Sequence, residues 1–98
     1  MGYPQNDIFT GEISGSTTAK QLPILPGSLV VIKAVASNTG NVYVGGAGVT
    51  KVDGTTDATT GIELAAGETT GWLRCRDLSQ FYIICDNAGD DITYMVLN

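Results

Sequence analysis

Residues that could carry out catalysis are scarce in this sequence. Histidine, the usual general base and the commonest metal ligand in proteins, does not occur in its 98 residues. Cys75 could act as a nucleophile, but only Arg74 and Arg76 are at hand to stabilise a thiolate, and strand alternation turns both arginines to the opposite face. Cys75 fits better as a small, buried apolar residue. We therefore expect no enzyme and no catalytic residues.

Carboxylates are the next groups that could do chemistry. Asp86, Asp90 and Asp91 surround one predicted turn, and Asp53 and Asp57 lie in a glycine-rich segment, so loop oxygens could bind Ca²⁺. Their spacing matches no EF-hand loop, and aspartate is common in turns because its side chain bonds to the nearby backbone. The glycines of GGAG lack the helix and lysine of a phosphate-binding loop. The sequence thus predicts turns here, with no metal and no cofactor.

Trp72 is the only tryptophan and the remaining residue with a recognisable binding chemistry. Beside Tyr82 or Tyr43, an exposed Trp72 could stack on a sugar ring. Alternation places it on the face opposite Leu73 and Cys75, so it either lies outward in an interface or covers a second core face. We expect a packing or interface role, with sugar binding as the alternative.

The elements that must position these residues are short strands separated by turns. Residues 72–76, 81–85 and 92–97 are rich in aromatic and β-branched side chains and are separated by DLSQ and DNAGDD. If the first two segments form a hairpin across DLSQ, Cys75 faces the region of Tyr82 and not Cys85, so no disulfide is expected. The whole chain contains 13 glycines, and this region has no helical signal. The sequence therefore predicts an all-β fold of about eight strands.

The middle of the chain predicts more strands. Residues 28–38, SLVVIKAVASN, are apolar at both alternating sets of positions, which favours a central strand. NTGN predicts a tight turn, and residues 41–46, NVYVGG, its hairpin partner, with two valines facing the core and Tyr43 facing outward. Residues 45–60 form the main loop, and IELAAGET gives a further short strand. The predicted core comprises Val30, Ile32, Val42, Val44, Leu64, Leu73, Ile83 and Ile92.

Residues 1–16 contain three large apolar groups, Tyr3, Ile8 and Phe9, among turn-forming residues. The segment is either an edge strand docked on its own domain or an arm that packs against a neighbouring subunit. We therefore divide the chain into an N-terminal arm or edge strand at 1–16 and a β-sandwich domain at 17–98.

Composition narrows the choice of partners. Ten acidic residues against five basic ones give a net charge of −5, and the bases are scattered, so we expect no nucleic-acid binding. No apolar run approaches the ~20 residues of a membrane span, and no membrane association is expected. The start, MGYPQNDIFTGE, has neither the basic region nor the apolar core of a signal peptide. We expect synthesis in the cytoplasm, with both cysteines reduced.

A longer pattern of strands and turns begins at Asn41. It consists of NVYVGGAGV, a variable loop, GIELAAGET and the C-terminal DLSQFYIICDNAGDDITYMVLN. This order resembles small tailed-phage virion proteins of the capsid decoration, or cement, type. Their pattern combines an NVYVG-like hairpin arm, an L-x-x-G-E turn, an L-x-x-I/F-Y-V/I strand and a terminal V/I-x-Y strand. The matching segments are Val42–Gly45, Leu64–Glu68, Leu78–Ile83 and Ile92–Tyr94.

The resemblance implies a single β-sandwich, jelly-roll-like, with an extended N-terminal arm. It also implies a homotrimer that binds the major capsid protein on the outside of the virion and stabilises the expanded shell. Our candidates for the capsid or subunit interface are Tyr3, Ile8, Phe9 and Trp72. Because similar sandwiches occur in other phage parts, the alternative is a carbohydrate-binding or host-recognition module of a phage fibre or tail appendage.

Overall fold

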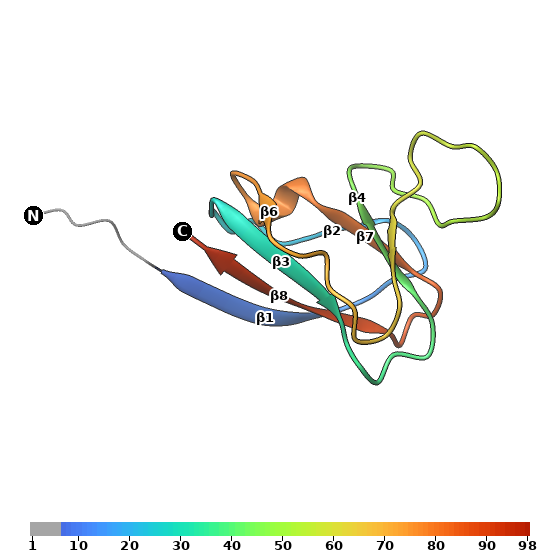
Figure 1. Ribbon diagram of the computed structural model, residues 1–98, viewed down its shortest axis with the longest axis horizontal. Coiled ribbons are helices and arrows are strands. Elements are labelled where there is room, and N and C mark those ends of the chain that lie inside the picture. The colour runs from blue at the N-terminus through green and yellow to red at the C-terminus, as the bar shows by residue number, and fades with distance from the viewer. Residues whose placement is uncertain (1–6) are drawn as a thin grey trace, which may run out of the picture.

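The computed structural model describes residues 7–98, which form two four-stranded antiparallel sheets packed as a β-sandwich (Figure 1). The first sheet has the strand order β1-β8-β3-β6, and the second has the order β2-β7-β4-β5. No helix in these residues is long and apolar enough to span a membrane. The strands are β1 (Ile8–Ser14), β2 (Lys20–Gln21), β3 (Leu29–Ala34), β4 (Val42–Gly45), β5 (Ile62–Leu64), β6 (Leu73–Arg74), β7 (Tyr82–Cys85) and β8 (Asp91–Leu97).

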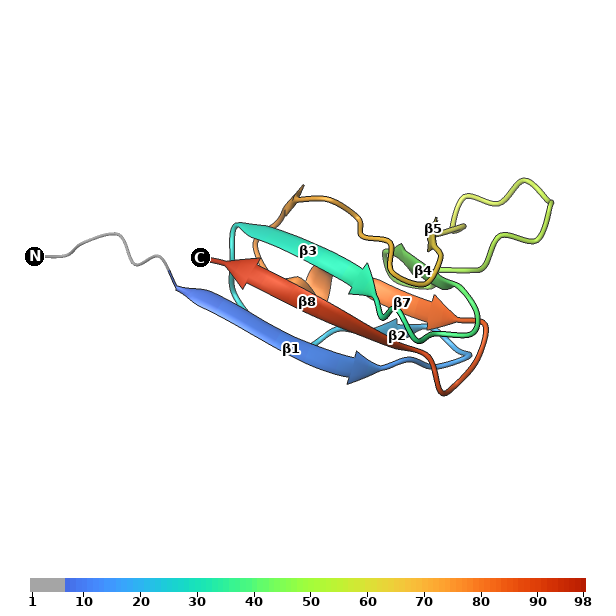
Figure 2. The same ribbon diagram turned by 60° about the horizontal axis from the view of Figure 1, so that its bottom comes forward.

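The strands pair as one long hairpin wrapped into two layers. β1 pairs with β8, β2 with β7, β3 with β6 and β4 with β5. The β3–β8 and β4–β7 pairs complete the two sheets. Figure 2 shows β1, β8 and β3 in front of β2, β7 and β4. Eight strands in two such sheets are a jelly roll, which confirms the expected fold class.

The core lies between the sheets and is built from alternate residues of each strand. In β3, Val30, Ile32 and Ala34 are fully buried, whereas the residues between them point away from the core. All predicted core residues are buried except Leu73, which packs only partly buried at edge strand β6. The core also includes residues that the sequence did not single out: Leu22, Ala34, Leu78, Cys85 and Val96.

The hairpin considered across DLSQ does not form, because β6 and β7 belong to different sheets. The connection contains η1 (Leu78–Gln80), a single 3-10 turn. Asp77 caps this turn, with its Oδ1 accepting hydrogen bonds from Ser79 N at 2.8 Å and from Leu25 N at 2.9 Å. The Leu78 side chain is buried in the core. These contacts carry the chain across the sandwich instead of back along β6.

The predicted hairpin at NTGN is wrong for a similar reason, since β3 and β4 also lie in different sheets. Asp90, in the turn between β7 and β8, is buried and accepts hydrogen bonds from Thr39 N and Gly40 N, both at 2.9 Å. Asn38 exchanges side-chain hydrogen bonds with the backbone of Asp91. Hydrogen bonding by Thr39 and Gly40 lowers the pKa of Asp90, although burial opposes this shift. The two connections therefore hold each other at one end of the sandwich.

Tyr43 does not face solvent as predicted, since its exposed fraction is 4%. The long loop between β4 and β5 covers it, and Val49 of this loop is also buried. Glycine provides the room, because a Cβ atom at Gly45 or Gly61 would lie within 2.8 Å of the Val49 side chain. Tyr43 Oη donates a hydrogen bond to Asp86 Oδ1 at 3.2 Å. The loop thus adds a small second apolar layer outside the second sheet.

The N-terminal part of the described chain is an edge strand of the first sheet. Residues 8–14 form β1 and pair along their whole length with β8. This arrangement corresponds to the edge-strand reading of that segment. Tyr3, the first of the predicted interface residues, lies outside the described residues.

We expect Ile32→Ala to lower the free energy of unfolding by about 2–5 kcal/mol, because Ile32 is fully buried between the sheets. Ile24→Ala is the matched control, since Ile24 is 83% exposed, and it should change stability by less than about 0.5 kcal/mol. Urea denaturation of both variants measures the difference. A loss below about 1 kcal/mol at Ile32 would show that the core is wrongly placed.

Asp90→Asn should destabilise the protein near neutral pH, because one end of an amide would present N–H groups to a backbone N–H donor. The pKa of Asp90 is lowered in the folded state, so its contribution is present above the unfolded pKa and is lost as pH falls through the folded pKa. The stability gap between wild type and variant should therefore shrink as the pH falls below the unfolded pKa of about 3.9 and on through the lower folded pKa.

Asp53→Asn is the control for this experiment. Hydrogen bonds from Thr55 also lower the pKa of Asp53, but they lie within the exposed loop and join no other element. Thermal unfolding across the pH series should show a much smaller effect for Asp53→Asn. Equal effects of the two substitutions would mean that the Asp90 contacts do not hold the two connections together.

Candidate interaction surface

The two cysteines are arranged as apolar packing residues. Both are free thiols, and burial raises the pKa of both, so each is protonated near neutral pH. Cys75 Sγ donates a hydrogen bond to Gly27 O at 3.3 Å, and Cys85 is fully buried in the core. The geometry fits the packing role for Cys75 and provides no thiolate nucleophile.

The acidic residues of the long loop bond to their own backbone and neighbouring hydroxyls. Asp53 Oδ1 accepts hydrogen bonds from Thr55 N and Oγ1, and Asp57 Oδ1 accepts from Thr59 N and Oγ1. These bonds lower the pKa of both carboxyl groups. Within residues 7–98, no group of three or more His, Cys, Asp or Glu side chains is placed to hold a metal ion. The arrangement is that of aspartate-stabilised turns.

The predicted interface residues within the described chain lie at opposite edges of the first sheet. Ile8 and Phe9 begin β1, with exposed fractions of 62% and 39%, and Trp72, just before β6, is 52% exposed. Ile8 and Trp72 point away from the core. Phe9 lies on the core side at the sheet edge, because it pairs with the buried Val96. The structure therefore separates Ile8 and Phe9 from Trp72 by two inner strands, β8 and β3.

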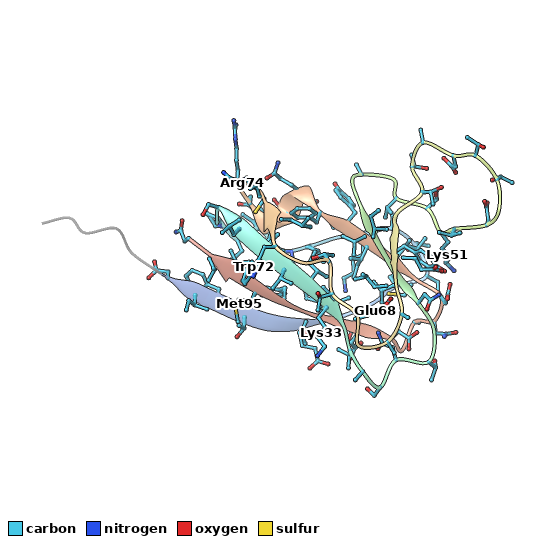
Figure 3. The ribbon with its side chains drawn as sticks, in the orientation of Figure 1. Lys33, Lys51, Glu68, Trp72, Arg74 and Met95 are labelled. Carbon is cyan, nitrogen blue, oxygen red and sulfur yellow. The ribbon has the colours of Figure 1, made fainter. Side chains whose placement is uncertain are left out.

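The side of the first sheet that is turned away from the core, which we call the outer face, connects these two edges. Thr10, Met95 and Val31 lie side by side across β1, β8 and β3. Trp72 continues this row on the far side of β3, as the β3–β6 register requires. Figure 3 shows Trp72 and Met95 over the same sheet. The apolar residues of the outer face are Ile8, Leu29, Val31, Trp72, Met95 and Leu97.

An open groove with a volume of about 420 Å³ crosses the outer face. Val31 and Met95 contribute apolar lining, and Gly11 and Tyr94 also line the groove. Lys33 brings the only positive charge of the lining. Hydroxyl groups come from β1, from the β5–β6 connection and from β8, through Thr10, Thr69 and Thr93.

Charged groups of both signs lie beside the apolar residues of the outer face. Lys33 and Glu12 share one row of the outer face, with Thr93 between them. The neighbouring carboxyl group of Asp91 raises the pKa of Glu12, because hydrogen bonding to the protonated form and repulsion between the two charges both favour a neutral Glu12. Arg74 marks the opposite edge of the sheet. A partner surface with several weak complementary charges would be oriented by this pattern.

A second cleft, of about 500 Å³, opens at the edge of the sandwich between β5 and β6. Ile62 shares a face with the buried Val44 but is 67% exposed, because the sheets do not close over it. Phe81 extends the apolar lining. The hydroxyl of Thr70 and the thiol of Cys75 already form hydrogen bonds within the protein. The cleft thus offers a ligand mainly apolar contacts.

Sequence reasoning missed Val31 and Met95 as surface residues. The apolar residues on both faces of residues 28–38 predicted a central strand, and β3 is indeed an inner strand. Only one of its faces packs on the core, however, since a two-layer sandwich covers each sheet on one side. On a strand of such a sandwich, apolar residues at the alternate positions that do not face the core are the signal that indicates an apolar outer face.

Comparisons with models of protein families, with curated proteins and with solved structures found no match. Of the outer face and the β5–β6 cleft, the outer face combines apolar area with charges of both signs.

Proposed function

We propose that this protein is a non-enzymatic structural component of a phage virion, which binds the outside of the capsid through its outer face and stabilises the shell. The observation that carries the proposal is the apolar row on the outer face, in which the exposed Trp72 continues the half-buried Val31 and Met95. Contiguous apolar groups on one face of a small domain typically mark a contact with another macromolecule. Tryptophan is among the residues that most often dominate such contacts.

The sandwich suits a passive binding role. Val31 and Met95 lie on β3 and β8, the two inner strands of the first sheet, and each of these strands is paired on both sides. Side chains on such strands lose little freedom on binding, which favours affinity without any rearrangement of the backbone. A decoration protein requires this property, because it must hold a shell in one conformation.

The proposed partner is the major capsid protein, as the resemblance implies, and the proposed location is the capsid surface. A shell presents the same contact many times, so linked copies of a weak binder can exceed the single-site affinity by ~10²–10⁴. The homotrimer that the resemblance implies would provide such linkage, and it stays a prediction.

A second candidate function is sugar binding by a phage fibre or tail module. The observation that favours it is the half-exposed Trp72 close to a groove with three threonine side chains, Thr10, Thr69 and Thr93. An aromatic platform beside hydroxyl groups can contact both the apolar face and the polar edge of a sugar ring.

Purified protein should sediment with expanded capsid shells. Trp72→Ala should weaken this attachment by about tenfold or more, because it removes the largest exposed anchor of the outer face. Val52→Ala is the matched control, since Val52 is an exposed apolar residue of the loop between β4 and β5. It should bind like the wild type, and circular dichroism should show that all three proteins are folded.

Two outcomes would contradict the capsid proposal. Equal attachment of Trp72→Ala and wild type would remove the outer face as the contact. A change in Trp72 fluorescence with sugars and a positive glycan array, together with no sedimentation, would favour the second candidate.

A further inference from the structure

The free edge of β1 carries hydrogen-bonding groups without partners in the described chain. Asn98 N donates to Asp7 O, and Gly15 N donates to Asp90 O, so the odd-numbered residues of β1 direct their backbone groups toward β8. The even-numbered residues therefore direct their N–H and C=O groups away from the sheet. Ile8, Thr10 and Glu12 have no backbone or side-chain partner for these groups within residues 7–98.

The sequence of this edge offers little protection against pairing with another strand. Exposed edges are usually blocked by proline, charged side chains or a bulge, and β1 contains only one such feature, the charge of Glu12, in its regular register of seven residues. Further protection lies only at its end, where Lys20 Nζ donates a hydrogen bond to Ser14 O at 2.9 Å. The unblocked stretch thus runs from Ile8 to Glu12.

We propose that a second copy of this chain pairs with β1 along this free edge, antiparallel and with a two-fold axis at Thr10. The register places Thr10 opposite Thr10 of the second copy and Ile8 opposite Glu12 of the second copy. Each such pair can exchange two backbone hydrogen bonds, so every unpartnered group of the stretch gains a partner. The two first sheets then form one continuous sheet across the dimer.

Side chains of this register are complementary. Phe9 falls opposite Gly11 of the second copy, in a pair whose backbones approach most closely. A Cβ atom at Gly11 would lie 2.5 Å from Tyr94 Oη, so the Tyr94 ring already occupies the space over this glycine. Phe9, which is 39% exposed in the single chain, can therefore cover Gly11 and contact Tyr94 of the second copy. At the axis, a Thr–Thr pair is a favourable cross-strand pair.

Competing registers are less favourable. A shift by one residue would oppose groups that already bond to β8. An axis at Gly11 would bring Ser14, whose carbonyl oxygen binds Lys20, opposite Ile8 of the second copy. An axis at Glu12 would place two carboxylates opposite each other. With the axis at Thr10, the two Glu12 residues lie four positions apart, about 13 Å, where salt screens their repulsion.

Sedimentation of the full chain in the absence of shells tests this pairing. The wild type should have twice the mass of the chain at micromolar concentration. Thr10→Pro removes an N–H that points to the free edge, so it keeps the β1–β8 ladder and should halve the mass without changing the circular dichroism. Thr10→Val keeps the N–H and should remain a dimer.

Hydrogen exchange gives a second readout that needs no variant. The amides of Ile8, Thr10 and Glu12 should be protected in the wild type and should lose this protection on dilution. A monomeric wild type, a dimeric Thr10→Pro variant or fast exchange at these amides would overturn the pairing. A mass three times that of the chain would also overturn it and would instead support the homotrimer. None of these results depends on whether the protein binds a capsid.

Discussion

The structure depends on one constraint: its two small sheets must share a single layer of apolar side chains. β2, β5 and β6 each have only two or three residues, and such strands are not stable in isolation. They persist because side chains such as Ile32 in the first sheet and Ile83 in the second bury each other's surface. Neither sheet could keep its shape without the other, so the outer face exists only as the reverse side of a complete core.

Side chains that bond to backbone groups decide where the chain crosses between sheets. Asp77 and Asp90 each accept hydrogen bonds from two backbone N–H groups. Asp77 lies between β6 and β7, and Asp90 lies between β7 and β8, so both are in connections that pass from one sheet to the other. In both cases a lone carboxylate satisfies amides that no strand ladder could reach. Backbone groups on the free edge of β1 have no hydrogen-bond partner within the described residues. They therefore remain available to a strand of another chain.

Much of the fold could be predicted from the sequence, because strand composition and alternation are local properties. The buried positions of Val30, Ile32 and Ile83 follow from them directly. The sheet to which each strand belongs does not, since a turn signal such as NTGN marks a change of direction without specifying the partner strand. Tyr43 was misplaced because strand alternation does not show that the loop directly after β4 folds back over the outside of its sheet. Alternation left Trp72 either outward in an interface or over a second core face, and its neighbours on the outer face come from β3 and β8, which only the three-dimensional pairing brings together.

The position of β8 has a consequence for the order of events during synthesis. This strand, Asp91–Leu97, lies between β1 and β3, so these two earlier strands do not pair with each other. The first sheet cannot assemble until residues 91–97 have left the ribosome, and the growing chain must stay soluble without it. The surface formed by β1, β8 and β3 therefore forms only after every strand of the second sheet has been synthesised. A nascent chain that still lacks residues 91–97 cannot engage a partner through this surface, which delays binding until the core strands of both sheets are present.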